Sequence, residues 1–169
     1  MDAEPKEVPM ILESPAFRDH DEIPERHTCE GADLSPPLSF HVGLPEARSL
    51  SLVVVDPDAP GHPWIHLVVY NLPPSTPGLP EALSAASLPV GARFGLNSWG
   101  RACWGGPCPP HGRHRYEFHL YALDAMLPEL GDVTRHALAR TMAGKVLAEA
   151  TLVGTYSLKR PSRREAART

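Results

Sequence analysis

The sequence predicts a mostly β fold with peripheral helices, formed by a single domain that spans residues 1–158. Two apolar, β-branched runs end at prolines, which is typical of buried central strands. A third run alternates between apolar and polar residues, and 20 prolines and 13 glycines in 169 residues indicate many ordered turns. A chain of this length buries roughly two-thirds of its unfolded surface, which is enough for one sizeable core.

The first strands are bounded by prolines. We expect a short edge strand at Met10-Ile11-Leu12, and a second strand after Pro36-Pro37, because proline is tolerated where a strand starts. Ser49 to Val55 and Ile65 to Leu72 are the predicted core of the sheet. Residues 73–92 are rich in Pro, Ser and Ala without a clean period, so they are expected to form a long surface connection.

The second half of the chain adds an alternating strand, a helix and a last strand. In Arg115 to Leu123, every second side chain is apolar, which predicts one buried and one exposed face. Thr134 to Ala148 carries apolar residues at helical spacing and predicts an amphipathic helix. Thr151 to Leu158 is the expected final strand, and residues 159–169 form a basic C-terminal tail that we expect to be flexible.

Charge and composition narrow the function classes. The net charge is −4, so nucleic acid is not an expected partner. No run approaches the ~18 apolar residues of a membrane span, and no secretory signal is apparent, so we expect a cytoplasmic protein without stable membrane insertion. Three cysteines do not suggest a secreted disulfide framework, although one pair could bridge; whether Cys29 reaches Cys108 stays open.

Two proline-rich loops mark the candidate site, Asp56-Pro57-Asp58-Ala59-Pro60 and Gly106-Pro107-Cys108-Pro109-Pro110. Each precedes a strand that carries a histidine. In an extended strand, Trp64 and His66 project from one face, as do His114 and Tyr116, whereas Ile65 and Arg115 point the other way. If the strands are neighbours, these groups converge at one sheet edge, where glycine allows a ligand to approach the main chain closely.

Such a cup would present imidazoles and backbone donors to an anion, while its carboxylates would repel that anion. An aspartate can resolve the conflict by holding a histidine in its charged or donor form, or by facing an ammonium group. A phosphate that bears an amine matches both kinds of group, because its phosphate faces the imidazoles and its ammonium faces a carboxylate. The predicted ligand is therefore a small anion or zwitterion, such as phosphate or a phosphorylethanolamine-like headgroup.

Simpler readings compete with this one. Asp56 and Asp58 could be turn formers, and the two histidines and aromatic residues could be packing residues. Cys103, Cys108, His111 and His114 offer zinc-ligand atom types at an uncommon spacing. A Cys-His hydrolase, with Cys108 or Cys103 as nucleophile and His114 as base, is a further alternative.

With these residues assembled, the chain resembles the phosphatidylethanolamine-binding protein family, and within it the bacterial and archaeal branch described as Raf kinase inhibitor-like. The resemblance runs from about Phe17 to Tyr156. It is carried by five motifs. In chain order they are Thr28-Cys29-Glu30-Gly31-Ala32-Asp33-Leu34-Ser35-Pro36-Pro37-Leu38, the first proline loop, Trp64-Ile65-His66, the second proline loop, and His114-Arg115-Tyr116 with Leu120-Tyr121-Ala122-Leu123-Asp124.

The resemblance implies a β-sandwich of that family's type and a surface pocket for anions and phospholipid headgroups. It implies a non-enzymatic binding and regulatory protein with no cofactor and no metal, which could act on a kinase or a serine protease and could form a homodimer. Arg115 is expected to serve as scaffold and to pair with an acidic loop residue. The implied pocket residues are Asp56, Asp58, Pro60, Trp64, His66, Gly106, Pro107, His114 and Tyr116.

The sequence departs from the family pattern in three places. Ile65 stands where some members carry a second histidine, the segment His111-Gly112-Arg113 is compact, and no long C-terminal helix is apparent after Tyr156. In eukaryotic members that helix borders the pocket. Its absence implies a more open site in this chain.

Overall fold

The computed structural model of the protein describes residues 9–131 and 135–160. The predicted tail falls outside these ranges except for Lys159 and Arg160. Among the helices of these ranges, none is long and apolar enough to cross a membrane.

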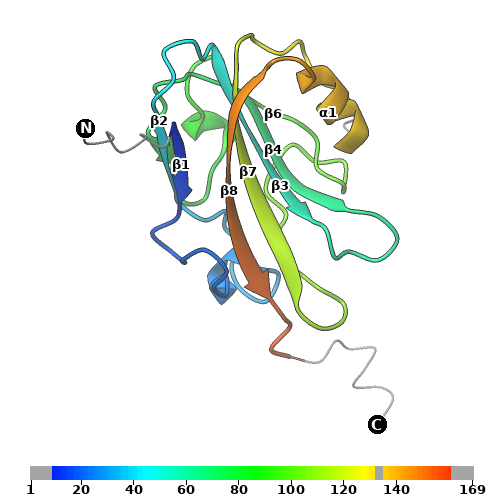
Figure 1. Cartoon of the computed structure of the whole chain (residues 1–169). Coiled ribbons are helices and arrows are strands. Elements are labelled where there is room, and N and C mark those ends of the chain that lie inside the picture. The colour runs from blue at the N-terminus through cyan, green and yellow to red at the C-terminus, as the bar shows by residue number, and fades with distance from the viewer. Residues whose placement is uncertain (1–8, 132–134, 161–169) are drawn as a thin grey trace, which may run out of the picture.

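Two antiparallel sheets form the domain (Figure 1), with strand orders β1-β2-β5 and β6-β4-β3-β7-β8. The strands are β1 (Met10–Glu13), β2 (Leu38–Val42), β3 (Ser49–Asp56), β4 (Trp64–Leu72), β5 (Gly78–Leu79), β6 (Arg93–Phe94), β7 (His114–Leu123) and β8 (Val146–Tyr156). One α-helix, α1 (Arg135–Met142), and two 3₁₀ turns, η1 (Glu25–His27) and η2 (Ala85–Ser87), complete the described elements. The predicted mostly β sandwich with peripheral helices is thus confirmed.

The main core lies between the two sheets, because alternate side chains of each strand face inward. On β7, Tyr116, Phe118, Leu120 and Ala122 have no exposed surface, as the alternation predicts. They pack with residues of the small sheet, such as Leu12 and Phe40. The strict alternation of β7 is therefore the signature of a strand with one core face.

A second, smaller core covers the other face of the large sheet. Leu138 and Met142 of α1 pack there on Val53, Val55 and Ile65. Because β3 is apolar on both of its faces, its sequence shows a continuous apolar run instead of an alternation. The burial of Ile65 in this cluster also shows that it points away from the main core.

The early strands follow the prediction closely. β1 pairs only with β2, which makes it an edge strand, and β2 begins directly after the two prolines. The connection 73–92 is not entirely irregular, because β5 pairs with β2 and brings Leu79 into the core. A two-residue strand is too short to produce a sequence period.

The predicted helix Thr134–Ala148 is too long at its C-terminal end. The helix ends at Met142, and Gly144 follows with φ +75°, a left-handed conformation that glycine adopts without strain. Val146 and Ala148 then pair with Leu123 and Ala122 of β7. Their apolar spacing therefore belongs to the start of the last strand, while Thr134 itself lies outside the described residues.

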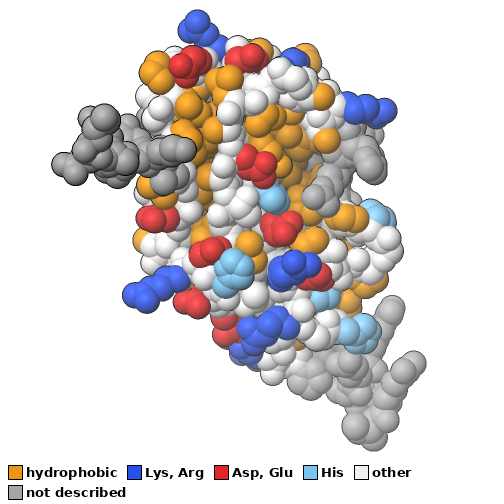
Figure 2. Space-filling view, viewed as in Figure 1, with side chains coloured by type: hydrophobic (Ala, Val, Ile, Leu, Met, Phe, Trp, Pro, Cys, Tyr) orange, Lys and Arg blue, Asp and Glu red, His pale blue; other side chains and the backbone are white. Residues whose placement is uncertain are grey.

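The face of the molecule that carries β7 and β8 has a mixed surface. Figure 2 shows acidic, basic and histidine side chains interspersed with hydrophobic ones on this face. His119 lies there between Glu117 and Glu149, with its Nδ1 2.9 Å from Oε1 of Glu149 and its Nε2 3.3 Å from Oε1 of Glu117. This distribution agrees with the small net charge of the whole sequence.

Candidate ligand-binding site

Three strand ends bring the candidate residues together. β3 runs antiparallel to both β4 and β7, so the end of β3 lies beside the beginnings of the other two strands. In the ladder, Asp56 pairs with Trp64, and Val55 pairs with Glu117. The side chains that follow β3 and those that open β4 and β7 therefore meet at one end of the sheet.

A cavity of about 250 Å³ occupies this end of the sheet, near the lower limit for small-molecule sites. Six of the nine predicted residues line it, while Asp58, Gly106 and Pro107 do not. The two loops and a third segment that contains Trp99 supply the remaining walls. Its lining residues are Asp56, Ala59, Pro60, Trp64, His66, Trp99, Cys108, Pro110, His114 and Tyr116.

The carboxylate of Asp56 stabilises a turn through one oxygen and holds His114 through the other. Its Oδ1 accepts the backbone N–H of Asp58 over 2.8 Å, and its Oδ2 lies 2.7 Å from Nδ1 of His114. Both side chains are buried. Because a carboxylate only accepts hydrogen bonds, Nδ1 of His114 carries the proton, and Nε2 is the ring nitrogen available to a ligand.

His66 is held in a similar way by a carbonyl group. Its Nδ1 donates to the backbone oxygen of Gly105 over 2.6 Å, and the N–H of Gly105 returns a bond to the oxygen of His66. The ladder between β3 and β4 skips His66, since Val54 pairs with Leu67 and Val55 with Ile65. His66 is therefore the extra residue of a β-bulge, a feature that re-aims side chains beside binding sites. Burial lowers the pKa of its imidazole.

Two buried donors lack partners at the cavity. Among the described residues, neither the hydroxyl of Tyr116 nor Nε1 of Trp64 makes a well-formed hydrogen bond. Burial raises the pKa of Tyr116, so its hydroxyl stays protonated and can donate. A buried donor without a partner costs about 1–3 kcal/mol, which a ligand oxygen would recover.

Trp99 lines the cavity but was not among the predicted residues. The residue is 46 % exposed, and its ring is nearly perpendicular to those of two neighbours, with centroids 5.0 Å from His66 and 5.5 Å from Trp64. It comes from an irregular loop that shortly precedes the second proline motif in sequence but belongs to neither motif. The segment Asn97-Ser98-Trp99-Gly100 has turn residues around one aromatic residue, but periodicity gives no sign of where that residue points.

The carboxylate of Asp58 forms an ion pair with Arg115. Its Oδ1 accepts a hydrogen bond from Nη2 over 2.9 Å, and its Oδ2 accepts one from Nε over 3.0 Å and one from the backbone N–H of Arg115. These bonds lower the pKa of Asp58. The pair ties the first loop to the start of β7, on the side where strand parity places Arg115. Arg115 is thus a scaffold residue, as expected.

Gly106 is a glycine because of packing against the protein itself. A Cβ added there would lie 2.1 Å from Oδ1 of Asp33 and 2.5 Å from the backbone oxygen of His27. Burial raises the pKa of Asp33, and the N–H of Gly106 and the indole of Trp104 both interact with its carboxyl group. The expected close approach of a ligand is thus not the reason for this glycine, which instead lets the loop pack on the segment around His27.

The second loop is also cross-linked. A disulfide joins Cys29 to Cys108, with their Cα atoms 5.5 Å apart, and the N–H of Cys29 bonds to the oxygen of Pro107. The pair left open by the sequence therefore does bridge. The disulfide thus links the motif that begins at Thr28 to Cys108, a lining residue of the cavity.

This disulfide bears on both chemical alternatives. The zinc hypothesis is wrong for the described residues, since no metal-binding group of His, Cys, Asp or Glu is found there and the sulfur of Cys108 is bonded to Cys29. In this state Cys108 cannot act as a nucleophile either, because it has no thiolate. Cys103 is a free, exposed thiol, but it does not line the cavity.

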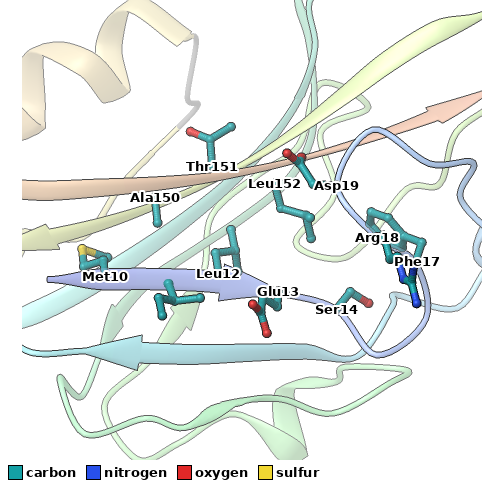
Figure 3. A pocket seen from close by; sticks show the side chains of 11 residues that line it. Met10, Leu12, Glu13, Ser14, Phe17, Arg18, Asp19, Ala150, Thr151 and Leu152 are labelled. Carbon is teal, nitrogen blue, oxygen red and sulfur yellow. The ribbon is translucent and has the colours of Figure 1, made fainter. Parts of the chain in front are cut away.

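A larger hollow, of about 600 Å³, lies at the open edge of the sandwich between β1 and β8 (Figure 3). Its base consists of core side chains such as Met10, Leu12 and Leu152, which are almost fully buried. Asp19 lies on its rim, and its carboxylate accepts a hydrogen bond from the backbone N–H of Val153. The hollow lacks the convergent, buried donors of the smaller cavity, which is therefore the better candidate.

The fold and the cavity together define a class of protein, a two-sheet β-sandwich with a small polar pocket at one end of its larger sheet. Within that class the chain belongs to the phosphatidylethanolamine-binding protein family, whose model matches residues 13–157. The predicted recognition is thereby confirmed, including its bacterial and archaeal branch.

Individual relatives support this assignment. A UPF0098 protein of Methanothermobacter thermautotrophicus is 46 % identical over 149 residues, which are 87 % of this chain and 98 % of the relative. The crystal structure of CT736 from Chlamydia trachomatis, described as a putative phosphatidylethanolamine-binding protein homolog, has a TM-score of 0.81 at 41 % identity, with 89 % and 98 % of the chains covered. E. coli YbcL has the same TM-score at 30 % identity, with 90 % and 100 % covered.

Proposed function

We propose that this member of the family is a non-enzymatic binding protein whose cavity takes a small phosphorylated ligand. The oxyanion lies at the base of the cavity, between the imidazoles of His66 and His114 and the hydroxyl of Tyr116. The observation that carries the proposal is the buried hydroxyl of Tyr116 in the cavity lining: its proton has no acceptor among the described residues, although the backbone N–H of Cys108 interacts with its oxygen. An oxyanion is the acceptor that would satisfy it.

The two histidines support the same ligand class. Each is fixed through Nδ1, so that Nε2 is left to a ligand. A protonated imidazole donates through Nε2 to an oxyanion. At His66, whose pKa burial lowers, anion binding is thus coupled to proton uptake. An anion would also gain the indole N–H of Trp64, which lacks a partner.

The function in the cell follows from recognition and not from chemistry. Cys108 is oxidised, and the described lining residues include no serine, threonine or free cysteine that the histidines could activate. Regulation of a kinase or of a serine protease, a homodimeric state and a cytoplasmic location remain predictions from the sequence and its resemblance. Recognition of a phosphorylated side chain by this cavity is the route by which such regulation would work.

A titration followed by NMR tests the proposal. With histidine side chains labelled, inorganic phosphate and phosphorylethanolamine should shift the ring signals of His66 and His114 in a saturable way. The signal of His41, on β2 and outside the cavity lining, serves as the internal control. Changes of equal size at His41, or none at His66 and His114, would show that the cavity does not bind phosphate.

A variant separates binding from folding. His66→Ala should weaken phosphate binding while the domain stays folded, because the ring lies at a cavity wall and its loss does not empty an apolar core site. If instead the melting temperature collapses and affinity is unchanged, His66 is a structural core residue.

A further inference from the structure

We propose that Trp99 and Trp64 form an aromatic corner that takes a trimethylammonium group joined to the phosphate held deeper in the cavity. The preferred ligand class is then a phosphate monoester of a quaternary ammonium alcohol. The inference rests on the proposed function, since it concerns the outer part of the same cavity.

The geometry of the two indoles supplies a corner. Their ring centroids are 5.5 Å apart and their planes meet at 79°, and both rings line the cavity. A cation that sits in such a corner contacts two π systems, and tryptophan is the side chain that attracts cations best. His66 stands edge-on to Trp99, with planes at 85°, which joins the corner to the anion-binding base.

Trp99 is held in place although it is half exposed. The buried side chain of Asn97 accepts the N–H of Trp99 over 3.0 Å and that of Arg101 over 3.1 Å, and it donates to the oxygen of Cys103. Gly105 lies directly behind the ring, where a Cβ would come within 2.3 Å of it. A rigid, exposed aromatic side chain is preorganised, so binding to it costs little entropy.

The surrounding groups favour a trimethylammonium over a primary ammonium. A primary ammonium has three donors and is strongly hydrated, so it needs acceptors when it leaves water. Both oxygens of Asp56 are already engaged, by the N–H of Asp58 and by His114. Ala59, Pro60, Pro110 and the disulfide-bonded Cys108 are the other lining residues that are exposed or half-buried, and their side chains offer no strong acceptor. A methylated cation needs none.

Charge agrees with this assignment. The described residues that line the cavity include no lysine or arginine, and the imidazoles of His66 and His114, which can carry positive charge, face the proposed anion. The carboxylate of Asp56 supplies the only formal negative charge of the lining. An anion with a cationic arm therefore meets donors at the base and aromatic faces at the mouth.

Calorimetric titrations with four compounds test the inference. They are phosphorylcholine, its neutral isostere 3,3-dimethylbutyl phosphate, phosphorylethanolamine and inorganic phosphate. Phosphorylcholine should bind about fivefold or more tightly than the neutral isostere, the size expected for a partly desolvated cation–π contact. It should also bind more tightly than phosphorylethanolamine.

The variants place the effect on Trp99. Trp99→Ala should bring the ratio between phosphorylcholine and its isostere close to one, and Trp99→Phe should restore part of it. Met126→Ala removes another exposed apolar side chain, one outside the cavity lining, and should leave the ratio unchanged. The melting temperature of each variant checks that it is folded.

The outcomes separate the two proposals. Equal affinities for phosphorylcholine and the isostere, or a ratio that Trp99→Ala leaves unchanged, would overturn the aromatic corner while phosphate binding stands. If inorganic phosphate and all three esters fail to bind the unaltered protein, the proposed function falls as well.

Discussion

The carboxylate of Asp56 and the imidazole of His114 form a buried pair, joined over 2.7 Å between Oδ2 and Nδ1. The two residues lie 58 positions apart in sequence, at the end of β3 and the start of β7. Because β3 and β7 are antiparallel neighbours, the end of β3 that carries Asp56 lies beside the start of β7 that carries His114. The pair fixes the orientation of the ring and the position of its proton.

Asp56→Asn should weaken the binding of inorganic phosphate about tenfold, because an amide that can turn its NH2 group toward Nδ1 no longer fixes the ring of His114 and its Nδ1 proton. Isothermal titration calorimetry at one pH measures the change. Asp58→Asn is the matched control: it weakens an ion pair with Arg115 outside the cavity lining and should alter the affinity less than twofold. Equal losses in both variants would mean that general charge, and not the pair, governs binding.

Tyr116→Phe should affect the empty and the bound protein differently. Without ligand, the free energy of unfolding should change by less than about 1 kcal/mol, because the hydroxyl proton has no acceptor among the described residues and only the interaction with the N–H of Cys108 is lost. Phosphate affinity should fall about fivefold to tenfold, since one donor to the oxyanion is lost. Urea unfolding with and without 50 equivalents of phosphate compares the two states. A variant that is less stable by more than about 1 kcal/mol when empty would show that the hydroxyl is already satisfied.

The sequence predicts the strands of the site well, because their signals are local. Parity alone separates His66 from Ile65 and Tyr116 from Arg115, and proline boundaries fix where the strands begin. The convergence of Asp56 with His114 needs only one further assumption, that the two strands are neighbours. For the same reason the partner of Arg115 could be predicted as an acidic loop residue.

The parts that the sequence does not predict depend on contacts that leave no periodic pattern in the sequence. Trp99 belongs to an aperiodic turn, and only the Asn97 network and Gly105 direct its ring to the cavity. The bulge at His66 leaves no mark on the hydrophobic pattern, because both His66 and Leu67 are buried. In the same way, Val146 to Ala148 fits a helical period as well as a strand, and only pairing with β7 decides between them.

Gly106→Ala should destabilise the protein by about 2–3 kcal/mol, the cost of overpacking a tight site. The added methyl group would meet Asp33 and the backbone of His27, neither of which can move freely. Thermal unfolding measures the loss. Gly112→Ala in the same loop region has open space around it, so only the left-handed backbone, at φ +65°, opposes it. A smaller loss in Gly106→Ala than in Gly112→Ala would contradict the packing argument.

Stability should fall as the pH drops below about 6.5. Burial lowers the pKa values of both His66 and His27 in the folded protein, whereas in the unfolded chain they titrate near 6.5. The unfolded state therefore binds more protons between the two pKa values. The stabilisation is complete above the unfolded pKa and is lost as the pH falls toward the folded one. Urea midpoints from pH 8 to pH 5.5 measure this slope, and His41→Gln should not alter it.

Anion binding should show the reverse dependence on pH. Sulfate keeps its charge over this range, so a rise in its affinity as the pH falls reports protonation of His66, whose pKa burial lowers. His66→Gln should flatten the rise. An affinity that is independent of pH would mean that sulfate is held by the uncharged donors alone.

The Cys29–Cys108 disulfide should contribute about 4 kcal/mol to stability, because it closes a loop across 79 positions of the unfolded chain. Cys29→Ser should therefore lower the melting temperature strongly, and it should also weaken phosphate binding, since Cys108 forms part of the cavity wall. Cys103→Ser removes the free thiol and should change neither property.

Both disulfide cysteines are exposed, so mild thiols should reduce the bond in the folded protein. Disulfides persist mainly in oxidising compartments, which differs from the cytosolic expectation. Alkylation of intact cells before lysis, followed by mass measurement, reports the state of the pair. Three alkylated cysteines would show that the bond is absent in the cell and that the reduced protein is the form to titrate.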